Sequence, residues 1–118
     1  MHIIDHLLWA AERDAEVLSL LQTQGDDPSI PRAVDFCLFA PDPKKAETVC
    51  GFINDARYGK AQVSLDGEKP RIIVVVHMPL VPEAVRALSA TMVSLSHVFS
   101  IEYAGWGCGV ETGTRKTA

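Results

Sequence analysis

The strongest constraint on the fold is an apolar run near the middle of the chain, IIVVV within RIIVVVHM at residues 71–78. A strand with consecutive apolar residues is typical of the centre of a sheet that is covered on both faces. AVDFCLFA at residues 33–40 is a second such run, rich in aromatic and β-branched residues. We therefore expect these two segments to be the central strands of one sheet.

Two further segments complete the sheet. KAQVSLDG at residues 60–67 alternates apolar and polar side chains, as an edge strand with one exposed face does. IEYAGWGCGVE at residues 101–111 has the pattern of a last strand, although glycines occupy every second position around Trp106. Glycine weakens a strand because it adds backbone entropy and has no side chain to pack. These glycines therefore need an explanation of their own.

Three helices accompany the strands. In the first of the two that connect strands, Asp42 is positioned as the N-cap, Pro43 as the first helical residue and Gly59 as the residue that closes the helix. Residues 78–100 predict the second connecting helix. The third helix precedes all the strands, at residues 2–23.

After the N-terminal helix, the order of elements is β-α-β-β-α-β, the split β-α-β pattern of ferredoxin-like domains. We expect an α+β fold in which a four-stranded antiparallel sheet carries both connecting helices on one face. At 118 residues the chain fits a single domain. Its parts are the N-terminal helix at residues 1–24, the ferredoxin-like core at 33–111 and a flexible polar tail at 112–118.

An apolar stripe on the N-terminal helix must be buried against another surface. Its members recur at spacings of three and four residues, and they are Ile4, Leu7, Leu8, Ala11, Ala15, Leu18 and Leu21. The acids of this helix, including Asp14, lie mostly off the stripe. The sheet face opposite the connecting helices is also too apolar to face water. We expect that face to be covered by the N-terminal helix, by a second copy of the chain or by a partner.

Composition excludes several classes of protein. The hydrophobic fraction of 47% and the charged fraction of 22% are those of a globular protein. A net charge of −4 disfavours nucleic acid as a partner, and the third strand has Ile and Val where an RNA-binding sheet needs aromatics. No apolar run is long enough to span a membrane, and the N-terminus lacks the basic segment of a signal peptide. We expect a cytoplasmic protein.

No metal site or catalytic set can be assembled from the reactive side chains. The three cysteines lack the close pairs that zinc sites use, so we expect free thiols, no metal and no cofactor. His77 is expected as a hydrogen-bonded histidine at a strand end. Asp35 lies inside an apolar strand, so its carboxylate needs a partner, for which Arg32 and Arg71 are candidates.

The glycines around Trp106 have three possible explanations. A phosphate cradle requires glycines that lead into a helix N-terminus, and no helix follows them here. The favoured explanation is structural: Gly105 and Gly107 permit a bulged or bent strand with close backbone approach, while Trp106 anchors the strand against the core. The alternative is that Trp106 is exposed and anchors a protein interface.

Two segments of the chain resemble the RraB family, the regulators of ribonuclease E activity. One is GDDPSIPR followed by VDF, after a helix ending EVLSLLQTQ. The other is the closing EY-x-GWG, which comprises Glu102, Tyr103, Gly105, Trp106 and Gly107. The likeness extends from residue 12 to residue 111, and it implies a ferredoxin-like fold with a protein-binding, inhibitory role and no catalysis.

Three positions depart from the family pattern. Ala104 stands where the family commonly has aspartate, and the tail carries Arg115 and Lys116 where the founding regulator is acidic. Acidic side chains at these positions would be suited to contact a basic nuclease. The sequence therefore lacks some of the acidic residues that such a contact would use.

We expect a non-catalytic regulator that binds another protein, and the resemblance implies a ribonuclease E-type enzyme as the partner. An immunity protein against a toxin is an alternative of the same class. A small enzyme or ligand-binding domain is the alternative from another class, with a pocket near Asp35, His77 and Tyr103. The candidates for partner binding or for structure are Asp35, Glu102, Tyr103, Gly105, Trp106 and Gly107.

Overall fold

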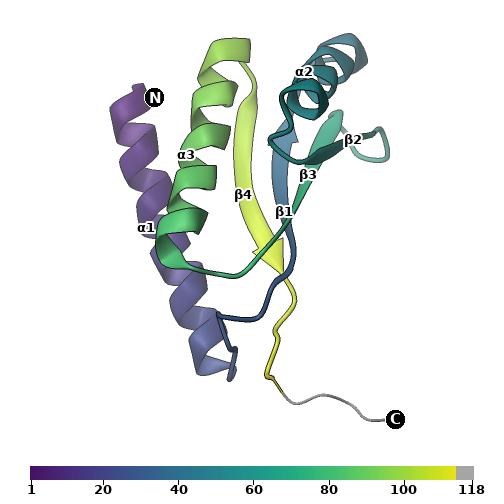
Figure 1. Cartoon of the computed structure of the whole chain (residues 1–118). Helices are drawn as coiled ribbons and strands as arrows, with labels where there is room; N and C mark the ends of the chain where they lie inside the picture. Colours follow the sequence, from purple (N-terminus) through teal and green to yellow (C-terminus); the bar gives the residue numbers. More distant parts are fainter. Residues whose placement is uncertain (114–118) are drawn as a thin grey trace, which may run out of the picture.

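The computed structural model describes residues 1–113 and contains three helices and four strands (Figure 1). In chain order they are α1 (Ile3–Thr23), β1 (Arg32–Phe39), α2 (Pro43–Ala56), β2 (Lys60–Ser64), β3 (Arg71–Met78), α3 (Pro82–Phe99) and β4 (Glu102–Cys108). Most of the predicted tail, residues 114–118, lies outside the described residues.

The four strands form one antiparallel sheet in the order β2-β3-β1-β4. The two central strands are therefore β1 and β3, and β2 is an edge strand, as their apolar patterns predict. The α+β sandwich with a ferredoxin-like arrangement of strands is confirmed. Bulky apolar side chains drive this arrangement because a strand buried on both faces removes the most apolar surface from water.

One face of the sheet forms the hydrophobic core with the helices. On β1, every second residue points to that core, beginning with Val34 and Phe36. Opposite them on β3 lie Val76 and Val74 in the antiparallel register. Helix α3 contributes Val85 and Met92 to the same core. Other fully buried members are Leu38, Val49, Ile53, Ile72, Leu80 and Val93.

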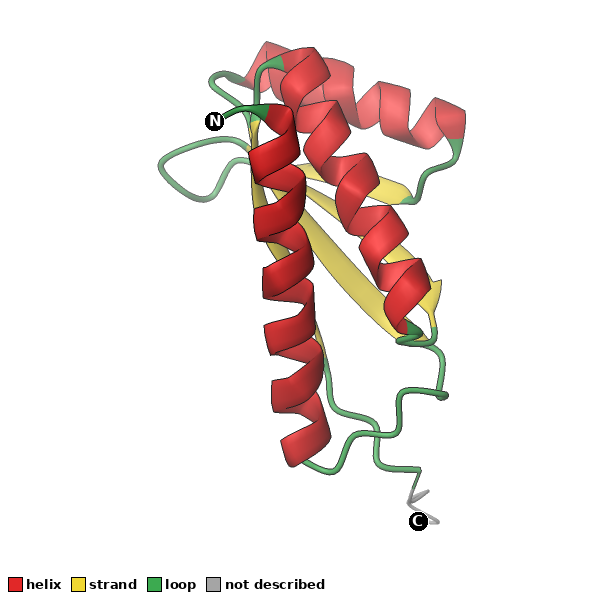
Figure 2. Ribbon diagram, turned by 90° about the vertical axis from the view of Figure 1, so that its left-hand side faces the viewer, coloured by secondary structure: helices red, strands yellow, loops and turns green. Residues whose placement is uncertain are grey.

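All three helices lie on the same side of the sheet (Figure 2). Helix α1 runs antiparallel to α3, and His6 Nδ1 lies 3.0 Å from His97 Nε2 where the start of α1 meets the end of α3. Of the three alternatives for covering the opposite sheet face, the one that assigns it to α1 is therefore wrong. Helix α1 instead extends the helical layer beyond α3, because its buried side chains meet α3 and the core-facing side of β4.

The uncovered sheet face, called the open face below, is only partly polar. Cys37 and Phe39 of β1 and Ile73 and Val75 of β3 are half-buried there, whereas Asp35 is exposed. A second copy of the chain or a partner protein remains the prediction for what covers the open face.

The predicted apolar stripe of α1 is correct in part, because its members Leu7, Leu18 and Leu21 pack in or against the core. Ala10, Asp14 and Leu21 are the buried residues of α1, whereas Ile4 and Leu8 of the predicted stripe are exposed. The physical reason is that α1 carries two neighbouring apolar rows, and the row that faces the core contains the polar Asp14. A sequence pattern favours the row without a charge, so the predicted stripe is centred to one side of the row that faces the core.

The ends of α2 are partly as predicted. Asp42 is the N-cap, and its carboxylate accepts a hydrogen bond of 2.8 Å from the backbone N–H of Lys45. The helix closes at Arg57, which has a left-handed φ of 62°, and not at Gly59 as predicted. Gly59 is required for another reason, because a Cβ there would lie 2.7 Å from Cγ1 of Val74. Among the described glycines, Gly59 is the one whose backbone approaches the core most closely.

Candidate functional site

The two segments that carry the family resemblance lie side by side. The connector between α1 and β1 runs next to the end of β4, and two backbone groups of Glu111 hold it there. The N–H of Asp27 donates to the carbonyl of Glu111 at 2.6 Å. The N–H of Glu111 donates to Oδ1 of Asp26 at 2.8 Å. Segments at opposite ends of the domain therefore form one continuous structure.

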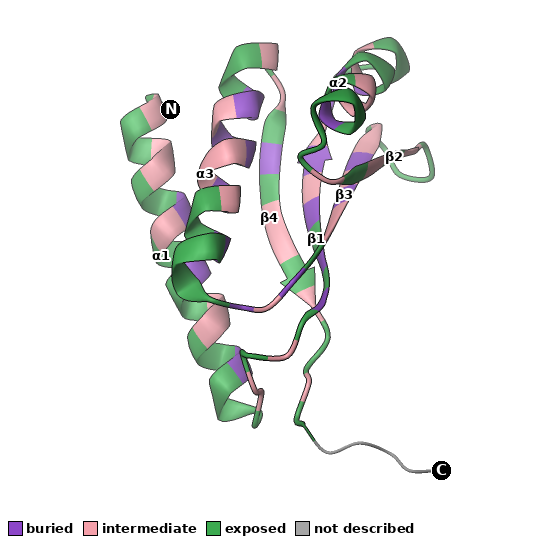
Figure 3. Ribbon diagram, viewed as in Figure 1, coloured by how far each residue is buried: buried purple, intermediate pink, exposed green. Residues whose placement is uncertain are grey.

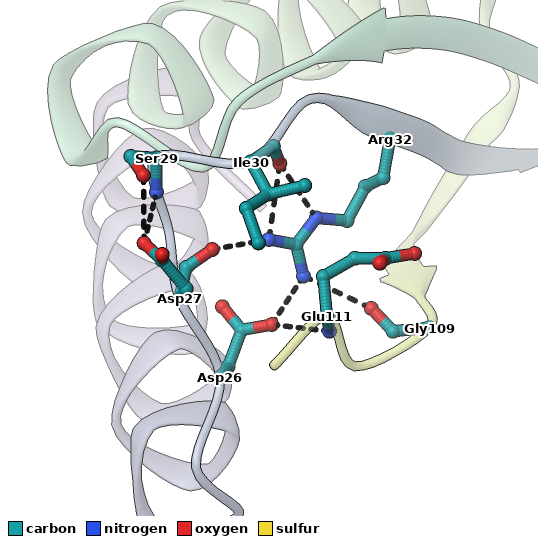
Figure 4. Close-up of polar contacts among 7 residues, drawn as sticks. All are labelled: Asp26, Asp27, Ser29, Ile30, Arg32, Gly109 and Glu111. Atoms are coloured by element: carbon teal, nitrogen blue, oxygen red, sulfur yellow. Dashed lines mark hydrogen bonds and ion pairs between the residues drawn. The ribbon is translucent and has the colours of Figure 1, made fainter. Parts of the chain in front are cut away.

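The Arg32 guanidinium is buried at the centre of this contact (Figure 4). It forms an ion pair with the Asp26 carboxylate. It also donates to the backbone carbonyls of Gly109 at 3.0 Å, Asp27 at 2.7 Å and Ile30 at 3.1 Å. A buried charge is tolerated only when it is paired and hydrogen-bonded, and Arg32 meets both conditions. We call this set of residues the Arg32 clasp.

Within the same connector, Asp27 and Ser29 form a tight turn. Oδ1 of Asp27 accepts hydrogen bonds from the Ser29 hydroxyl at 2.7 Å and from the Ser29 N–H at 3.0 Å. These hydrogen bonds lower the pKa of Asp27 because they stabilise the ionised carboxylate. The turn therefore fixes the path of the chain into Arg32.

A second buried polar group joins α1 to the core. Asp14 is only 4% exposed, and its Oδ1 accepts hydrogen bonds from the Ser89 hydroxyl at 2.7 Å and from Nε1 of Trp106 at 2.8 Å. The Tyr103 hydroxyl lies 3.4 Å from that of Ser89, and burial raises the pKa of Tyr103 well above its ordinary value. We call these four residues the Asp14 cluster. Among the described residues, Oδ2 of Asp14 has no hydrogen-bond partner.

Sequence reasoning missed the role of Asp14, although a signal for it exists. Asp14 occupies one position of a row at heptad spacing whose other members, Leu7, Ala10, Val17 and Leu21, are apolar. A lone carboxylate in such a row predicts a buried acceptor that needs donors. Those donors lie 75 and 92 positions further along the chain, so spacing alone cannot identify them.

The strand around Trp106 is bulged, as the glycines predict. Gly105 lies opposite Cys37 and Tyr103 lies opposite Leu38, so Ala104 is an extra residue on β4. Gly105 has a φ of +109°, a conformation that side chains resist. The predicted close backbone approach is wrong, because a Cβ at Gly105 would meet no atom within 4 Å, and the same holds at Gly107.

Trp106 is half-buried and contacts both the sheet and α1. Its ring lies 6.4 Å from that of Phe36, centroid to centroid, on the core side of the sheet. Its Nε1–H donates a hydrogen bond to Oδ1 of Asp14. This geometry favours the structural explanation of Trp106 over that of a freely exposed interface anchor.

The other signature residues do not gather with Trp106. Asp35 is exposed on the open face, so the expectation of a buried carboxylate with an arginine partner is wrong. Arg32 pairs with Asp26 instead. Glu102 is exposed at the start of β4 and forms a surface ion pair of 2.8 Å with Lys69. Surface pairs of this kind contribute little to stability.

The pocket expected near Asp35, His77 and Tyr103 is not formed. Asp35 and His77 are exposed on the open face of β1 and β3. Tyr103 lies on the opposite side of the sheet, where it is buried next to Ser89. The sheet therefore separates Tyr103 from the other two residues.

The cysteines are distributed over three elements and carry free thiols. Cys37 lies on β1, Cys50 on α2 and Cys108 on β4, and burial raises the pKa of each. Within residues 1–113, no three His, Cys, Asp or Glu side chains form a group that could hold a metal ion. No helix in that range has the length and apolar character that crossing a bilayer requires.

A groove lies between α1, α3 and the connector, with a volume of about 430 Å³. Its apolar walls come from Ala15 and Leu18 of α1 and from Pro28, Leu80 and Pro82. Its charged lining consists of Asp14, Asp26 and Arg86. The groove therefore lies between the Asp14 cluster and the Arg32 clasp, and the first family-like segment contributes Asp26 and Pro28 to it.

The fold and these two buried polar sets define a ferredoxin-like α+β domain with an added N-terminal helix. The model of the RraB family, regulator of ribonuclease activity B, matches residues 11–108. The chain belongs to this family, as the two signature segments predict. Its class is therefore that of the regulators of ribonuclease activity. Among individual curated proteins, none matches the chain significantly.

Proposed function

We propose that the chain binds a ribonuclease E-type enzyme and lowers its activity by protein–protein contact, without a catalytic step of its own. The observation that carries this proposal is the family match, which covers the chain from the middle of α1 to the last residue of β4. The match therefore includes all four strands, the Asp14 cluster, and the Arg32 clasp except for Gly109 and Glu111, which follow the end of β4.

The charge of the chain supports a protein partner with a basic surface. The net charge is −4, so long-range attraction would favour a basic nuclease and disfavour the RNA that it cleaves. Binding the enzyme and not its substrate is what a regulator of this kind requires.

The absence of catalysis is supported by the state of the reactive side chains. The Ser89 hydroxyl donates to a buried carboxylate, and its hydrogen-bond contacts within residues 1–113 are Asp14 and Tyr103, not a histidine. The three thiols have raised pKa values, so they are protonated and weakly nucleophilic at neutral pH. The histidines His6 and His97 contact each other at the surface.

The test is a cleavage assay with the purified ribonuclease E-type enzyme of the same organism and a fluorogenic RNA. We expect the initial rate to fall and to saturate as the chain is added, and the two proteins to co-elute in size-exclusion chromatography. RNA incubated with the chain alone should remain intact. An unrelated endoribonuclease, assayed in parallel, should keep its rate.

An unchanged cleavage rate together with separate elution, at a large molar excess of the chain, would contradict the proposal. An immunity-type role predicts that result, because its target would be a toxin and not this enzyme. RNA cleavage by the chain alone would contradict the non-catalytic part of the proposal only.

A further inference from the structure

Helix α1 carries two apolar rows, and the fold buries one of them far more than the other, of which Leu18 packs against the core. The row that faces the core contains Asp14 and packs on α3 and β4. The second row lies next to the first on the helix surface, one residue further around the helix axis. We call it the outer seam, and it consists of Ile4, Leu8, Ala11, Ala15 and Leu18. Its spacings of four, three, four and three are those of a helix that packs against another helix.

The outer seam is open to solvent over the first turns of α1. Ile4 is 59% exposed and Leu8 is 60% exposed. Figure 3 shows exposed residues along the whole length of α1, with its buried residues on the side turned toward α3. A row of apolar residues that a fold leaves in water marks a site of interaction.

Toward its C-terminal end, the outer seam continues into the groove between α1 and α3. Ala15 and Leu18 belong to both, and Leu80 and Pro82 form the facing wall. The groove volume of about 430 Å³ can receive one or two apolar side chains. The exposed seam and the groove therefore form one elongated apolar surface.

The edge of the outer seam is acidic. Asp5, Glu12 and Glu16 lie beside it on the side away from the core and are exposed. Arg13 is the only Lys or Arg of α1, and its pair with Glu16 has a separation of 3.5 Å at an exposed site. On the other side, Arg86 lines the groove together with Asp14 and Asp26. The surface as a whole carries excess negative charge.

We infer that the outer seam and the groove dock one amphipathic helix of the ribonuclease, with an apolar stripe flanked by Lys and Arg. This inference rests on the proposed function and names the surface and the partner chemistry. The acidic edge attracts the basic flank, and it disfavours a second copy of this chain, whose own acidic edge would be brought close to it. Asp14 lines the groove, and its buried Oδ2 has no hydrogen-bond partner among the described residues, so it offers an acceptor close to a basic side chain that enters.

The experiment compares Leu8→Asp with Leu20→Asp. The two leucines belong to the same helix and have nearly equal exposure, 60% and 58%. They are twelve positions apart, which places Leu20 about 120° around the helix from Leu8 and off the outer seam. The dissociation constant for the purified ribonuclease E-type enzyme is measured by calorimetry for both variants and for wild type. Thermal unfolding of the three chains shows whether each variant keeps its fold.

We expect Leu8→Asp to raise the dissociation constant about tenfold or more, because a charge is forced into an apolar contact. Leu20→Asp should stay within about twofold of wild type. Ile4→Asp is a second variant of the seam and should behave like Leu8→Asp. The double variant Glu12→Lys, Glu16→Lys should weaken binding most at low salt, since it removes the attraction for a basic flank.

Each alternative outcome has a distinct meaning. If wild type binds and Leu8→Asp binds equally well, the inference is overturned and the proposed function stands. The same holds if Leu8→Asp and Leu20→Asp weaken binding equally. If wild type alone sediments as a dimer that Leu8→Asp dissociates, the occupant is a second copy and the inference is overturned. If wild type does not bind the enzyme, both the proposed function and the inference fail.

Discussion

At the scale of single residues, Trp106 is held by two kinds of contact. Its ring packs near Phe36, and its Nε1–H donates to Asp14. We expect Trp106→Ala to lower the free energy of unfolding by about 3 kcal/mol, the low end for a large aromatic because Trp106 is half-buried. The measurement is a urea denaturation curve next to wild type.

The Trp106→Phe variant separates the two contacts. It keeps an aromatic ring but leaves Asp14 with one donor fewer, which costs about 1–3 kcal/mol for a buried acceptor. A midpoint for Trp106→Ala within error of wild type would contradict the structural explanation. It would make Trp106 the leading candidate for a partner contact.

Gly105 and Gly107 offer a matched pair on one strand. Both have open space where a Cβ would be, but only Gly105 has a positive φ. We therefore expect Gly105→Ala to lower the free energy of unfolding by about 1–2 kcal/mol through backbone strain. Gly107→Ala should change it by less than about 0.5 kcal/mol. Equal effects of the two substitutions in thermal or urea unfolding would contradict this.

At the scale of elements, the sheet could be predicted from sequence because each strand carries its own signal. The apolar content of β1 and β3 identified the central strands, and the alternation in β2 identified an edge. The Asp42 N-cap of α2 was predicted for the same reason, since its partner is three residues away. Strands and helix ends can be predicted from sequence when the residues that determine them are close together in the chain.

The orientation of α1 and both buried polar sets could not be predicted. By pattern, the apolar row without a charge fits a core better than the row that contains Asp14, yet packing on α3 buries the row with Asp14. The Arg32 clasp and the Asp14 cluster depend on partners far away in sequence, as the pairing of Asp14 with Trp106 illustrates. Such contacts follow from topology, so a periodic pattern can mark Asp14 as a buried acceptor but cannot identify its donors.

Deleting residues 1–20 should reveal how much of the fold depends on α1. The truncated chain loses Asp14, so Trp106 and Ser89 lose their shared acceptor, and the side of α3 that packs on α1 is exposed to water. We expect aggregation, measured by light scattering and size-exclusion chromatography. A soluble monomer with the melting temperature of wild type would show that α1 is dispensable for the fold.

At the scale of the whole molecule, Tyr103 makes the free energy of unfolding decrease as pH rises in the alkaline range. Burial raises the pKa of Tyr103 above its ordinary value of about 10. Above about pH 10 the unfolded chain loses this proton while the folded chain retains it. The stabilisation is therefore complete below that pH and is lost as pH rises toward the folded pKa, by up to about 1.4 kcal/mol per pH unit.

Tyr103→Phe should remove this contribution. We expect the free energy of unfolding of the variant to fall less steeply than that of wild type between about pH 9 and about pH 11. Guanidinium denaturation at a series of pH values measures both slopes. Parallel slopes would show that other groups govern the alkaline limit.

The Arg32 clasp has a consequence for how long the folded molecule lasts. It joins Arg32 to Gly109 across 77 positions and Asp26 to Glu111 across 85, so it requires nearly the whole chain to be in place. We expect contacts that close such long loops to form late, after the folding barrier has been crossed, because closing a long loop costs chain entropy. Arg32→Met should therefore speed unfolding while refolding keeps its rate, which the two arms of a chevron plot report separately. A slowed refolding arm would place the clasp in the folding nucleus and contradict this expectation. If only unfolding is faster, the clasp sets the lifetime of the native state. It then also sets the resistance of the chain to proteolysis, under conditions where a protease cleaves the opened chain faster than the chain recloses.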